Sequence, residues 1–495
     1  MVTKDKVVAP RMLLPFGADA VAEALHDDVK TVAPHQEHYA AQVDEGIDVA
    51  DSALGMFARS TTTSAMRTSH AVKYDVRRHS AVRTDDYIFS QLIPYIGNKR
   101  KLLPLITRGL QHTGCRRGLF VDLFAGSTVV ARMAKSLGYR VVANDWEPYS
   151  YEIARGTVSL NHVPSFSHVG RPEQVFTYLN QLEPLHGYIA RHLCPEDDEH
   201  PDVMRERMFF TRQNGERIDA IQEQIATWES EHKLSLDERA FLLNSLTYAV
   251  SYASNTSGVF KGFHNGWGGK TGTALYRIRG VLTLAPSAVF DNRQENMALR
   301  EDAQRLASRL PEILGQRPDI VYVDPPYNQH PYGSNYHVLN TVTLWDKPKL
   351  NPDILVNGRP YDKSAIRKDW RTERRSAYNT RKAALPAFRS LIDRLDARWV
   401  LVSYSTDGNM SARDVLRVLA AKGALSVFTH TYKRYRVSTP RMSPKSHNVE
   451  FLVVLDTEGP SSLQRVDELY ERILRQEDVA IRPAPVPAEL QLPLL

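Results

Sequence analysis

The residues after position 86 alternate between apolar runs and helical spacings of apolar residues. Residues 118–123 form a mainly apolar run that ends at a turn containing Gly126, and residues 129–137 place apolar side chains at helical spacing. Residues 139–145 form a second such run, which ends in an acid. Strand, tight turn, helix and strand predict a βαβ unit with parallel strands and a right-handed crossover.

Three later apolar runs predict further strands, at residues 320–323, 399–404 and 449–455. Continuous apolar runs are typical of strands that are buried on both faces, so we expect these strands to be parallel as well. Residues 151–286 have mostly helical spacings instead. The pattern therefore predicts an α/β protein, in which a Rossmann-like doubly wound sheet is interrupted by a mostly helical block.

The 495-residue chain is longer than one hydrophobic core usually holds, so we expect several parts. The sheet domain is predicted from residues 87–155 and 287–460, with the helical block at residues 156–286 as an inserted subdomain. Residues 1–86, rich in Ala, His, Asp, Thr and Ser, are expected to form a partly disordered N-terminal extension of unknown role. Residues 461–495 predict a C-terminal helix and a Pro-rich tail.

The composition is that of a globular protein, because 42% of the residues are hydrophobic and 24% are charged. Cys115 and Cys194 match neither a metal-binding spacing nor a disulfide framework, which favours a reducing, cytoplasmic setting. No apolar run is long enough to cross a bilayer, and the N-terminus lacks the pattern of a signal peptide. We therefore expect a cytoplasmic protein that has no membrane partner.

The positive charge points to a polyanionic partner mainly where the basic residues cluster. A formal charge of +6 is weak evidence for a polyanionic partner in a chain of this length. Aromatic and hydroxyl side chains are interleaved with basic ones at residues 367–381 and 432–445, however. Such a mixture suits phosphate contact and base stacking, so we interpret both stretches as DNA-facing, the alternative being a solvated helix or loop.

A candidate nucleoside site lies at the first βα turn. In Phe124-Ala125-Gly126-Ser127 the small residues allow a ligand to approach the backbone, and the following helix offers free N–H groups. Asp145 ends the next strand, where an acid can accept hydrogen bonds from both ribose hydroxyls. Trp146 follows directly, either to lie against an adenine ring or to pack as an ordinary aromatic residue.

The strongest candidate chemistry is Asp324-Pro325-Pro326-Tyr327, which follows the apolar run at residues 320–323. An exocyclic amino group of a base is a poor nucleophile, because its lone pair is delocalised into the ring. The Asp324 carboxylate and the carbonyl between the two prolines can accept both amino hydrogens and turn the lone pair toward a sulfonium methyl. Tyr327 supplies a face for an extruded base.

These motifs resemble the Dam-like (alpha-group) adenine-N6 DNA methyltransferases, in which the cofactor motif comes first and the target-recognition region precedes the catalytic motif. The resemblance spans about residues 90–455 and rests on residues 94–99 (PYIGNK) with Leu102 and Leu103, 122–127 (DLFAGS), 144–145 (ND), 301–303 (EDA), 324–327 (DPPY) and 403–408 (SYSTDG). One departure is the turn Gly126-Ser127-Thr128, where the family often has a second glycine.

The resemblance implies S-adenosylmethionine as the cofactor and no metal. It implies that Tyr95, Gly97 and Lys99 contact the methionine end of the cofactor and the catalytic pocket. Asp122, Phe124 and Gly126 belong to the motif beside the cofactor. By the same resemblance, Asp145 binds the ribose and Asp302 lies near the cofactor adenine.

Two loops are expected to face double-stranded DNA, at residues 255–272 and 332–337. Lys261, Trp267 and Tyr336 are the candidate DNA contacts in these loops, together with Arg434 in the second basic stretch. Phe260 and Phe263 are candidates for intercalation. Ordinary loop packing is the alternative for each of them.

The sequence thus predicts a site-specific DNA methyltransferase that modifies N6 of a flipped-out adenine. A cytosine-N4 DNA enzyme, an adenine-N6 RNA enzyme and a catalytically silent DNA-binding protein on the same fold are the alternatives. Asp324 favours adenine, because the cytosine-N4 variants more often carry Ser at this position. A cognate restriction enzyme and a phage-defence system are both compatible as partners, as is the absence of either.

Overall fold

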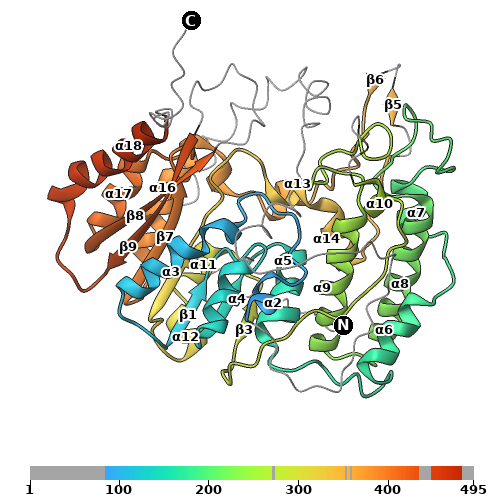
Figure 1. Cartoon of the computed structure of the whole chain (residues 1–495), viewed down its shortest axis with the longest axis horizontal. Coiled ribbons are helices and arrows are strands. Elements are labelled where there is room, and N and C mark those ends of the chain that lie inside the picture. Colours follow the sequence, from blue (N-terminus) through green and yellow to red (C-terminus); the bar gives the residue numbers. More distant parts are fainter. Residues whose placement is uncertain are drawn as a thin grey trace, which may run out of the picture. The chain divides into compact units, whose positions relative to one another are not determined.

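A computed structural model describes residues 84–269, 272, 274–351, 354–356, 359–433 and 447–481 (Figure 1). The described residues all belong to one compact unit. Most of the predicted N-terminal extension and of the Pro-rich tail lies outside the described residues. So do Arg434 and nearly all of the second basic stretch.

A seven-stranded sheet forms the centre of the described structure, in the order β3-β2-β1-β4-β7-β9-β8. Its strands are β1 Leu119–Asp122, β2 Arg140–Asn144, β3 Met297–Leu299, β4 Ile320–Val323, β7 Trp399–Ser405, β8 Ala424–Lys433 and β9 His447–Asp456. From β3 to β7 all neighbours are parallel, whereas β9 is antiparallel to both β7 and β8. The predicted α/β class, the βαβ unit and the strands in the three later runs are confirmed.

The predicted parallel direction is wrong for the last run. β9 lies between β7 and β8 and is buried on both faces, so its residues read as a continuous apolar stretch. Burial on both faces produces such a stretch in either direction, which is why the pattern did not reveal the antiparallel pairing. β3 and β8 were not predicted. β3 is three residues long, and β8 buries alternate residues such as Leu425 and Val427, as expected for an edge strand.

Helices cover both faces of the sheet (Figure 1). One face packs on α2 Thr84–Phe89, α3 Leu103–His112 and α4 Val129–Ser136; the other packs on α11 Ala303–Leu306, α12 Leu310–Leu314, α16 Arg381–Arg394, α17 Ala412–Ala420 and α18 Val466–Ile481. The side chains of β1 alternate accordingly, since Leu119 and Val121 join the second core and Phe120 joins the first.

The helical block between β2 and β3 has a core of its own. Its main helices are α5 Pro148–Ala154, the π-helical turn η4 Arg155–Ser159, α6 Pro172–Asn180, α7 Tyr188–Leu193, α8 Arg212–Ser230, α9 Leu236–Ala253 and α10 Leu275–Ile278. Thr211 caps α8, and Ser235 with Glu238 forms a capping box at the start of α9. α14 His337–Leu344, which follows β4, packs into the same core.

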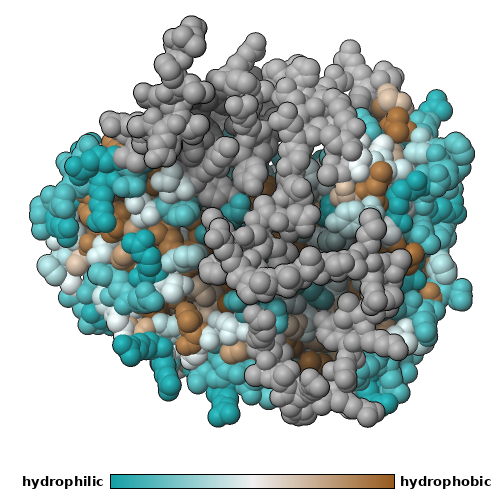
Figure 2. All heavy atoms as spheres, viewed as in Figure 1, coloured by the Kyte–Doolittle hydropathy of each residue, from teal (hydrophilic) through white to brown (hydrophobic). Residues whose placement is uncertain are grey.

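Short elements complete the described chain: η3 Lys99–Leu102, α13 Tyr332–Asn335, β5 Leu355–Val356, β6 Arg359–Pro360, α15 Trp370–Glu373, η5 Ala377–Asn379 and η6 Leu463–Arg465. Within the described ranges, no helix is both long and apolar enough to cross a membrane. The face drawn in Figure 2 is mainly hydrophilic outside its grey region, with only scattered brown patches.

Candidate active site

A pocket opens at the carboxyl ends of β1, β2 and β4, where the strand order reverses direction. Ligands of open α/β sheets bind at this kind of switch point. The pocket and the open solvent at its mouth together amount to about 910 Å³ of space. Its wall comes from residues 95–97, 99, 123–124, 144–147, 301–304, 324–327, 332 and 375–378.

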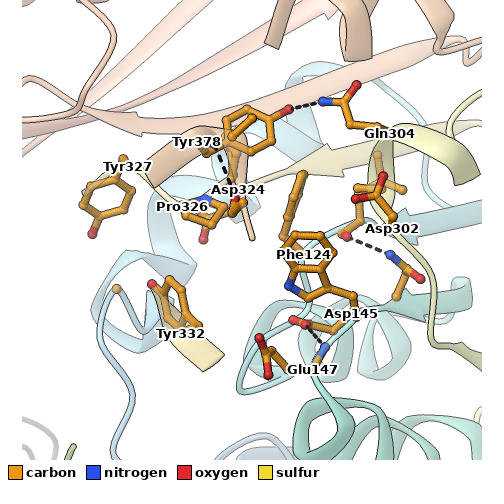
Figure 3. A pocket seen from close by; sticks show the side chains of 18 of the residues that line it. Phe124, Asp145, Glu147, Asp302, Gln304, Asp324, Pro326, Tyr327, Tyr332 and Tyr378 are labelled. Atoms are coloured by element: carbon orange, nitrogen blue, oxygen red, sulfur yellow. Dashed lines mark hydrogen bonds between the residues drawn. The ribbon is translucent and has the colours of Figure 1, made fainter. Parts of the chain in front are cut away.

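Asp324 follows β4 and reaches this pocket (Figure 3). One carboxylate oxygen, Oδ2, lies 2.8 Å from Lys99 Nζ. The other, Oδ1, is buried and has no hydrogen-bond partner among the described residues. Burial raises the pKa of Asp324 above its usual value, and Lys99 opposes that rise. The motif therefore presents a desolvated acceptor that the protein itself does not satisfy.

Lys99 is almost fully buried in η3, at 3% exposure. It donates to the carbonyl of Gly97 at 3.1 Å and lies over the Tyr327 ring, 5.3 Å from the centroid. Burial lowers the pKa of Lys99, but the carboxylates of Asp324 and Glu450 outweigh burial and the net pKa is raised. Lys99 is therefore a charged ammonium that is fixed beside the catalytic motif.

Tyr95 packs tightly against the turn after β1. A Cβ at position 126 would meet the Tyr95 ring at 2.7 Å, and φ of Gly126 is +49°, so both space and backbone conformation favour glycine there. The Tyr95 ring stacks on Tyr336 at 4.9 Å and on Tyr332 at 5.1 Å. An aromatic stack thus joins the PYIGNK segment to the chain beyond the catalytic motif.

Asp145 ties this turn to the end of β2. Its Oδ2 accepts from the amide of Gly126 at 2.9 Å, and its Oδ1 accepts from the amide of Glu147 at 3.0 Å. Ser150 Oγ donates to the carbonyl of Gly126 at 2.7 Å. The predicted pair of turn and acid is therefore in direct contact, and Asp145 lines the pocket.

Asp302 lies on the opposite side of the pocket from Asp324 (Figure 3). The preceding residue is held by Asn144, whose Nδ2 donates to the Glu301 carbonyl and whose Oδ1 accepts from the Glu301 amide, both at 3.1 Å. Asp302 caps α11 by accepting from the amide of Arg305. Of the predicted cofactor residues, Tyr95, Gly97, Lys99, Phe124, Asp145 and Asp302 line the pocket, as do all four residues of the catalytic motif.

Asp122 and Gly126 are not among the described residues that line this pocket. Asp122 is buried at the end of β1, and Gly126 lies behind the Tyr95 ring. Both residues therefore lie behind the residues that line the pocket. Their assignment to the cofactor stays a prediction.

Part of the pocket wall was not predicted from the sequence. It is formed by residues 375–378, within a segment, residues 369–379, that we call the strap. Tyr378 in the strap is buried, accepts a hydrogen bond from Gln304 Nε2 at 2.8 Å, and meets the Phe124 ring edge-on at 5.7 Å. Asn379 Nδ2 donates to the carbonyl of Asn328 at 2.8 Å, just after the catalytic motif. The strap therefore contacts both the pocket and the catalytic loop.

Buried ion pairs anchor the strap and correct the expectation that the whole stretch 367–381 faces DNA. Arg374, 6% exposed, pairs with Asp369 at 2.8 Å and lies 3.4 Å from Glu147, which lines the pocket. Arg367, also buried, makes a bidentate pair with Asp346, with both distances 2.6 Å. Burial raises the pKa of Glu147 to about 7, even though Arg374 acts against the shift.

The structure also contradicts direct DNA contacts for three predicted aromatic residues. Tyr336 is fully buried, and Phe260 and Phe263 lie inside the core of the helical block, because the apolar rings pack there rather than remaining in water. Trp267 is half-buried and donates from Nε1 to the Asp198 carbonyl at 2.8 Å. Lys261 is exposed. DNA contacts by Lys261 and Trp267 stay predictions.

We expect Tyr336→Phe to lower the free energy of unfolding by about 1–3 kcal/mol without a selective loss of DNA affinity. The Tyr336 hydroxyl accepts from the amide of Ile96 at 2.8 Å, and phenylalanine would leave that amide without an acceptor. Urea denaturation measures the difference. Tyr361→Phe, at a side chain that is 65% exposed, is the matched control and should change the free energy by less than about 0.5 kcal/mol.

Residues 95–357 match the family model described as D12 class N6 adenine-specific DNA methyltransferase. The chain is 30% identical to modification methylase StsI of Streptococcus sanguinis, over 72% of this chain and 51% of that protein. It is 29% identical to type II methyltransferase M.FokI of Planomicrobium okeanokoites, over 73% of this chain and 52% of that protein.

A shorter relative aligns over nearly its whole length. Type II methyltransferase M.NlaIII of Neisseria lactamica is 29% identical, over 73% of this chain and 98% of that protein. By contrast, the chain spans only about half the length of StsI and M.FokI. No solved structure matches the chain.

Proposed function

Because the chain belongs to the D12 class of N6 adenine-specific DNA methyltransferases, we propose that it methylates N6 of adenine at a specific sequence in double-stranded DNA. The observation that carries the proposal is Asp324 Oδ1, a buried acceptor without a partner among the described residues, at the wall of a pocket. The order of the segments favours the Dam-like subgroup. Residues 95–99 and 124–127 precede the helical block, and the catalytic motif follows it.

The residues of the pocket fit S-adenosylmethionine. Asp145 and Asp302 offer carboxylates to a ribose and an adenine, while Phe124, Trp146 and Tyr378 supply aromatic surface. We therefore assign these residues to the nucleoside end and Tyr95, Gly97 and Lys99 to the methionine end. When bound, the cofactor would supply the methyl group as an activated sulfonium.

Asp324 and the Pro325 carbonyl act on the amino group of the target adenine. The two groups accept hydrogen bonds from both N6 hydrogens, which turns the nitrogen lone pair out of conjugation with the ring. The two prolines fix the direction of the carbonyl. Since Oδ2 of Asp324 pairs with Lys99, the unpartnered Oδ1 is the atom that receives the proton released by N6.

Tyr327 provides the stacking face for the flipped base. Its ring is held edge-on against Tyr404 at 6.0 Å, and the Asn409 amide donates to the Tyr327 carbonyl at 2.9 Å. A base inside the duplex is out of reach of such a site, so the target adenine has to be extruded. We assign recognition of the DNA sequence to the helical block, with the exposed Lys261 as one contact. As a protein partner we propose a cognate restriction enzyme.

The function is tested by expressing the full chain in a methylation-deficient bacterial host and sequencing the genomic DNA by a long-read method that detects N6-methyladenine. We expect one methylated sequence motif in the wild type and none with Asp324→Ala. Methylation of cytosine N4, or of RNA alone, would contradict the proposal. Retained cofactor and DNA binding without any methylation would favour a silent DNA-binding protein instead.

We expect Trp146→Ala to raise the dissociation constant for S-adenosylmethionine about tenfold, because the lost aromatic contact contributes about 1.4 kcal/mol. Trp146 is half-buried and lines the pocket beside Asp145. Isothermal titration calorimetry of the free protein measures the change. Tyr276→Ala, at a side chain that is 72% exposed, should leave the constant unchanged.

A further inference from the structure

The strap is fastened on two sides of the pocket. On one side Tyr378 accepts from Gln304 at 2.8 Å and meets the Phe124 ring at 5.7 Å. On another side Arg374 lies 3.4 Å from Glu147. Gln304 belongs to α11, whereas Glu147 follows β2, and Figure 3 shows these two side chains at opposite edges of the pocket. The residues between Arg374 and Tyr378 line the pocket, so they form a wall that is held at both of its ends.

Arg374 makes ion pairs with three carboxylates. Its Nη2 lies 2.8 Å from Asp369 and its Nη1 lies 3.1 Å from Glu373, and both of these acids belong to the strap. The third carboxylate, Glu147, lies outside the strap. This contact is an ion pair and not a hydrogen bond, because Nε of Arg374 has no hydrogen-bond partner among the described residues. Of the three pairs, the one with Glu147 is therefore the one that ties the strap to the end of β2.

Glu147 is held in place independently of the strap. Its Oε2 accepts from Asn340 Nδ2, on α14, at 2.7 Å, and its amide donates to Asp145 at 3.0 Å. Gly333 on α13 packs against it so closely that a Cβ there would lie 3.0 Å from Glu147 Oε1. Glu147 is 2% exposed and lines the pocket two residues after the acid that we assign to the ribose. It is a fixed point to which the strap can be attached.

We propose that Glu147 and Arg374 are positioning residues that form a latch, which holds the strap as a fixed wall of the pocket and thereby slows the release of S-adenosylmethionine. The inference rests on the cofactor assignment in the proposed function. A wall that is ordered before binding adds no ordering cost when the cofactor binds. Differences in affinity of this kind appear mainly in the dissociation rate. Both partners are buried, so solvent and salt screen their attraction little.

The strap also contacts the loop that follows the catalytic motif. Asn379 Nδ2 donates to the carbonyl of Asn328 at 2.8 Å. Asn409 joins the two segments, because its Nδ2 donates to the Tyr378 carbonyl and its amide donates to the Tyr327 carbonyl, both at 2.9 Å. These contacts do not involve the latch, so they should keep the end of the strap in place when the latch is broken. We therefore expect the latch to affect cofactor release more than methyl transfer.

The first measurement is the release of S-adenosylhomocysteine from the full-length protein by stopped-flow tryptophan fluorescence, since Trp146 lines the pocket. The pH is kept above the value of about 7 to which burial raises the pKa of Glu147. We expect Arg374→Met and Glu147→Gln each to raise the dissociation rate constant about tenfold, with less than about a threefold change in the association rate constant. Arg371→Met, at an exposed arginine of the same strap, should match the wild type.

The double variant tests whether the two residues act as one unit. Either substitution breaks the same ion pair, so the double variant should release S-adenosylhomocysteine only about tenfold faster than the wild type. Two independent contributions would instead multiply to about a hundredfold. In single-turnover methylation, the cofactor concentration that gives half the maximal rate should rise about tenfold in each variant, while the maximal rate falls less than about threefold. A general loss of structure would lower the maximal rate as well.

The second measurement needs no cofactor. The amides of Arg374 and Asn379 donate to the carbonyls of Trp370 and Ser376, so hydrogen exchange of the strap reports its opening. In the free protein we expect the strap to exchange about tenfold faster in Glu147→Gln than in the wild type, with exchange in α9 unchanged. The glutamine keeps an oxygen that can accept from Asn340. This variant therefore tests the latch even if Arg374→Met does not fold.

Three outcomes would overturn the latch while leaving the proposed function intact. They are unchanged release from a folded Arg374→Met variant, effects that multiply in the double variant, and strap exchange in Glu147→Gln equal to that of the wild type. If the wild type did not bind S-adenosylhomocysteine, the cofactor assignment would fail and the latch with it. If the wild type bound it but left adenine in DNA unmethylated, the proposed target would be wrong and the latch would stand on its own measurements.

Discussion

Asp324→Asn is expected to lower the single-turnover rate of adenine methylation by about 10³-fold or more, with little change in affinity for DNA or S-adenosylmethionine. The amide has nearly the size of the carboxylate, so the pocket keeps its shape. It lacks the negative charge that pairs with Lys99, and its NH₂ group cannot accept an amino hydrogen or the released proton. Chemistry should therefore suffer far more than binding.

Rapid-quench kinetics at saturating DNA and cofactor separates these effects, with fluorescence anisotropy and calorimetry reporting the two affinities. Asp393→Asn, at an exposed carboxylate on α16, is the control for loss of a negative charge. A loss of less than tenfold in Asp324→Asn would show that this carboxylate is not the acceptor. A collapse of cofactor affinity would show that it belongs to the binding site instead.

Lys99→Met is expected to have the second largest effect, because it leaves buried carboxyl groups without their cation. Breaking such a pair costs about 3–5 kcal/mol unless the remaining acid becomes protonated. The pKa of Asp324 is already raised by burial, and without Lys99 it would rise further. We therefore expect a neutral Asp324 at pH 7 and a loss of activity of at least about 10²-fold.

The direction of the pH dependence follows from that shift. Activity of Lys99→Met should partly return as pH increases, since Asp324 regains its charge. The free energy of unfolding of the variant should fall as pH increases. An acid whose pKa is raised in the folded state stabilises the fold at low pH, and this stabilisation is lost as pH rises through the folded pKa. Urea denaturation and single-turnover rates between pH 6 and about 9 test both trends. Lys101→Met, at an exposed lysine of the same turn, should show neither.

Much of this site was predictable because its motifs sit at the ends of strands. Gly126, Asp145 and Asp324 each follow an apolar run, and parallel strands bring their carboxyl ends to one edge of a sheet. The predicted grouping of these segments around one pocket requires only that the runs be strands and that they be parallel. Both conditions hold for β1, β2 and β4.

The strap was not predictable in the same way. Arginines mixed with aromatic residues suit a DNA surface and a buried ion-pair network equally well. Arg374 pairs with the nearby Asp369 but also with Glu147, which lies far earlier in the chain. Nothing local distinguishes Tyr378, which lines the pocket, from an aromatic residue that faces DNA. The long-range ion pair shows that the strap belongs to a buried network and not to a DNA surface. A single sequence does not reveal which distant residues pair.

The sheet extends beyond the segment that matches the family model, which ends at residue 357. β4 has β7 as its outer neighbour, and β9 and β8 follow in turn. A polypeptide cut at residue 357 would expose the hydrogen-bonding edge of β4 and would remove α16 and α17 from the core on one face of the sheet. Such an edge invites pairing with other chains. Expression of residues 95–357 alone should therefore yield aggregates rather than a minimal catalyst, and any shortened version has to keep residues through the end of β9.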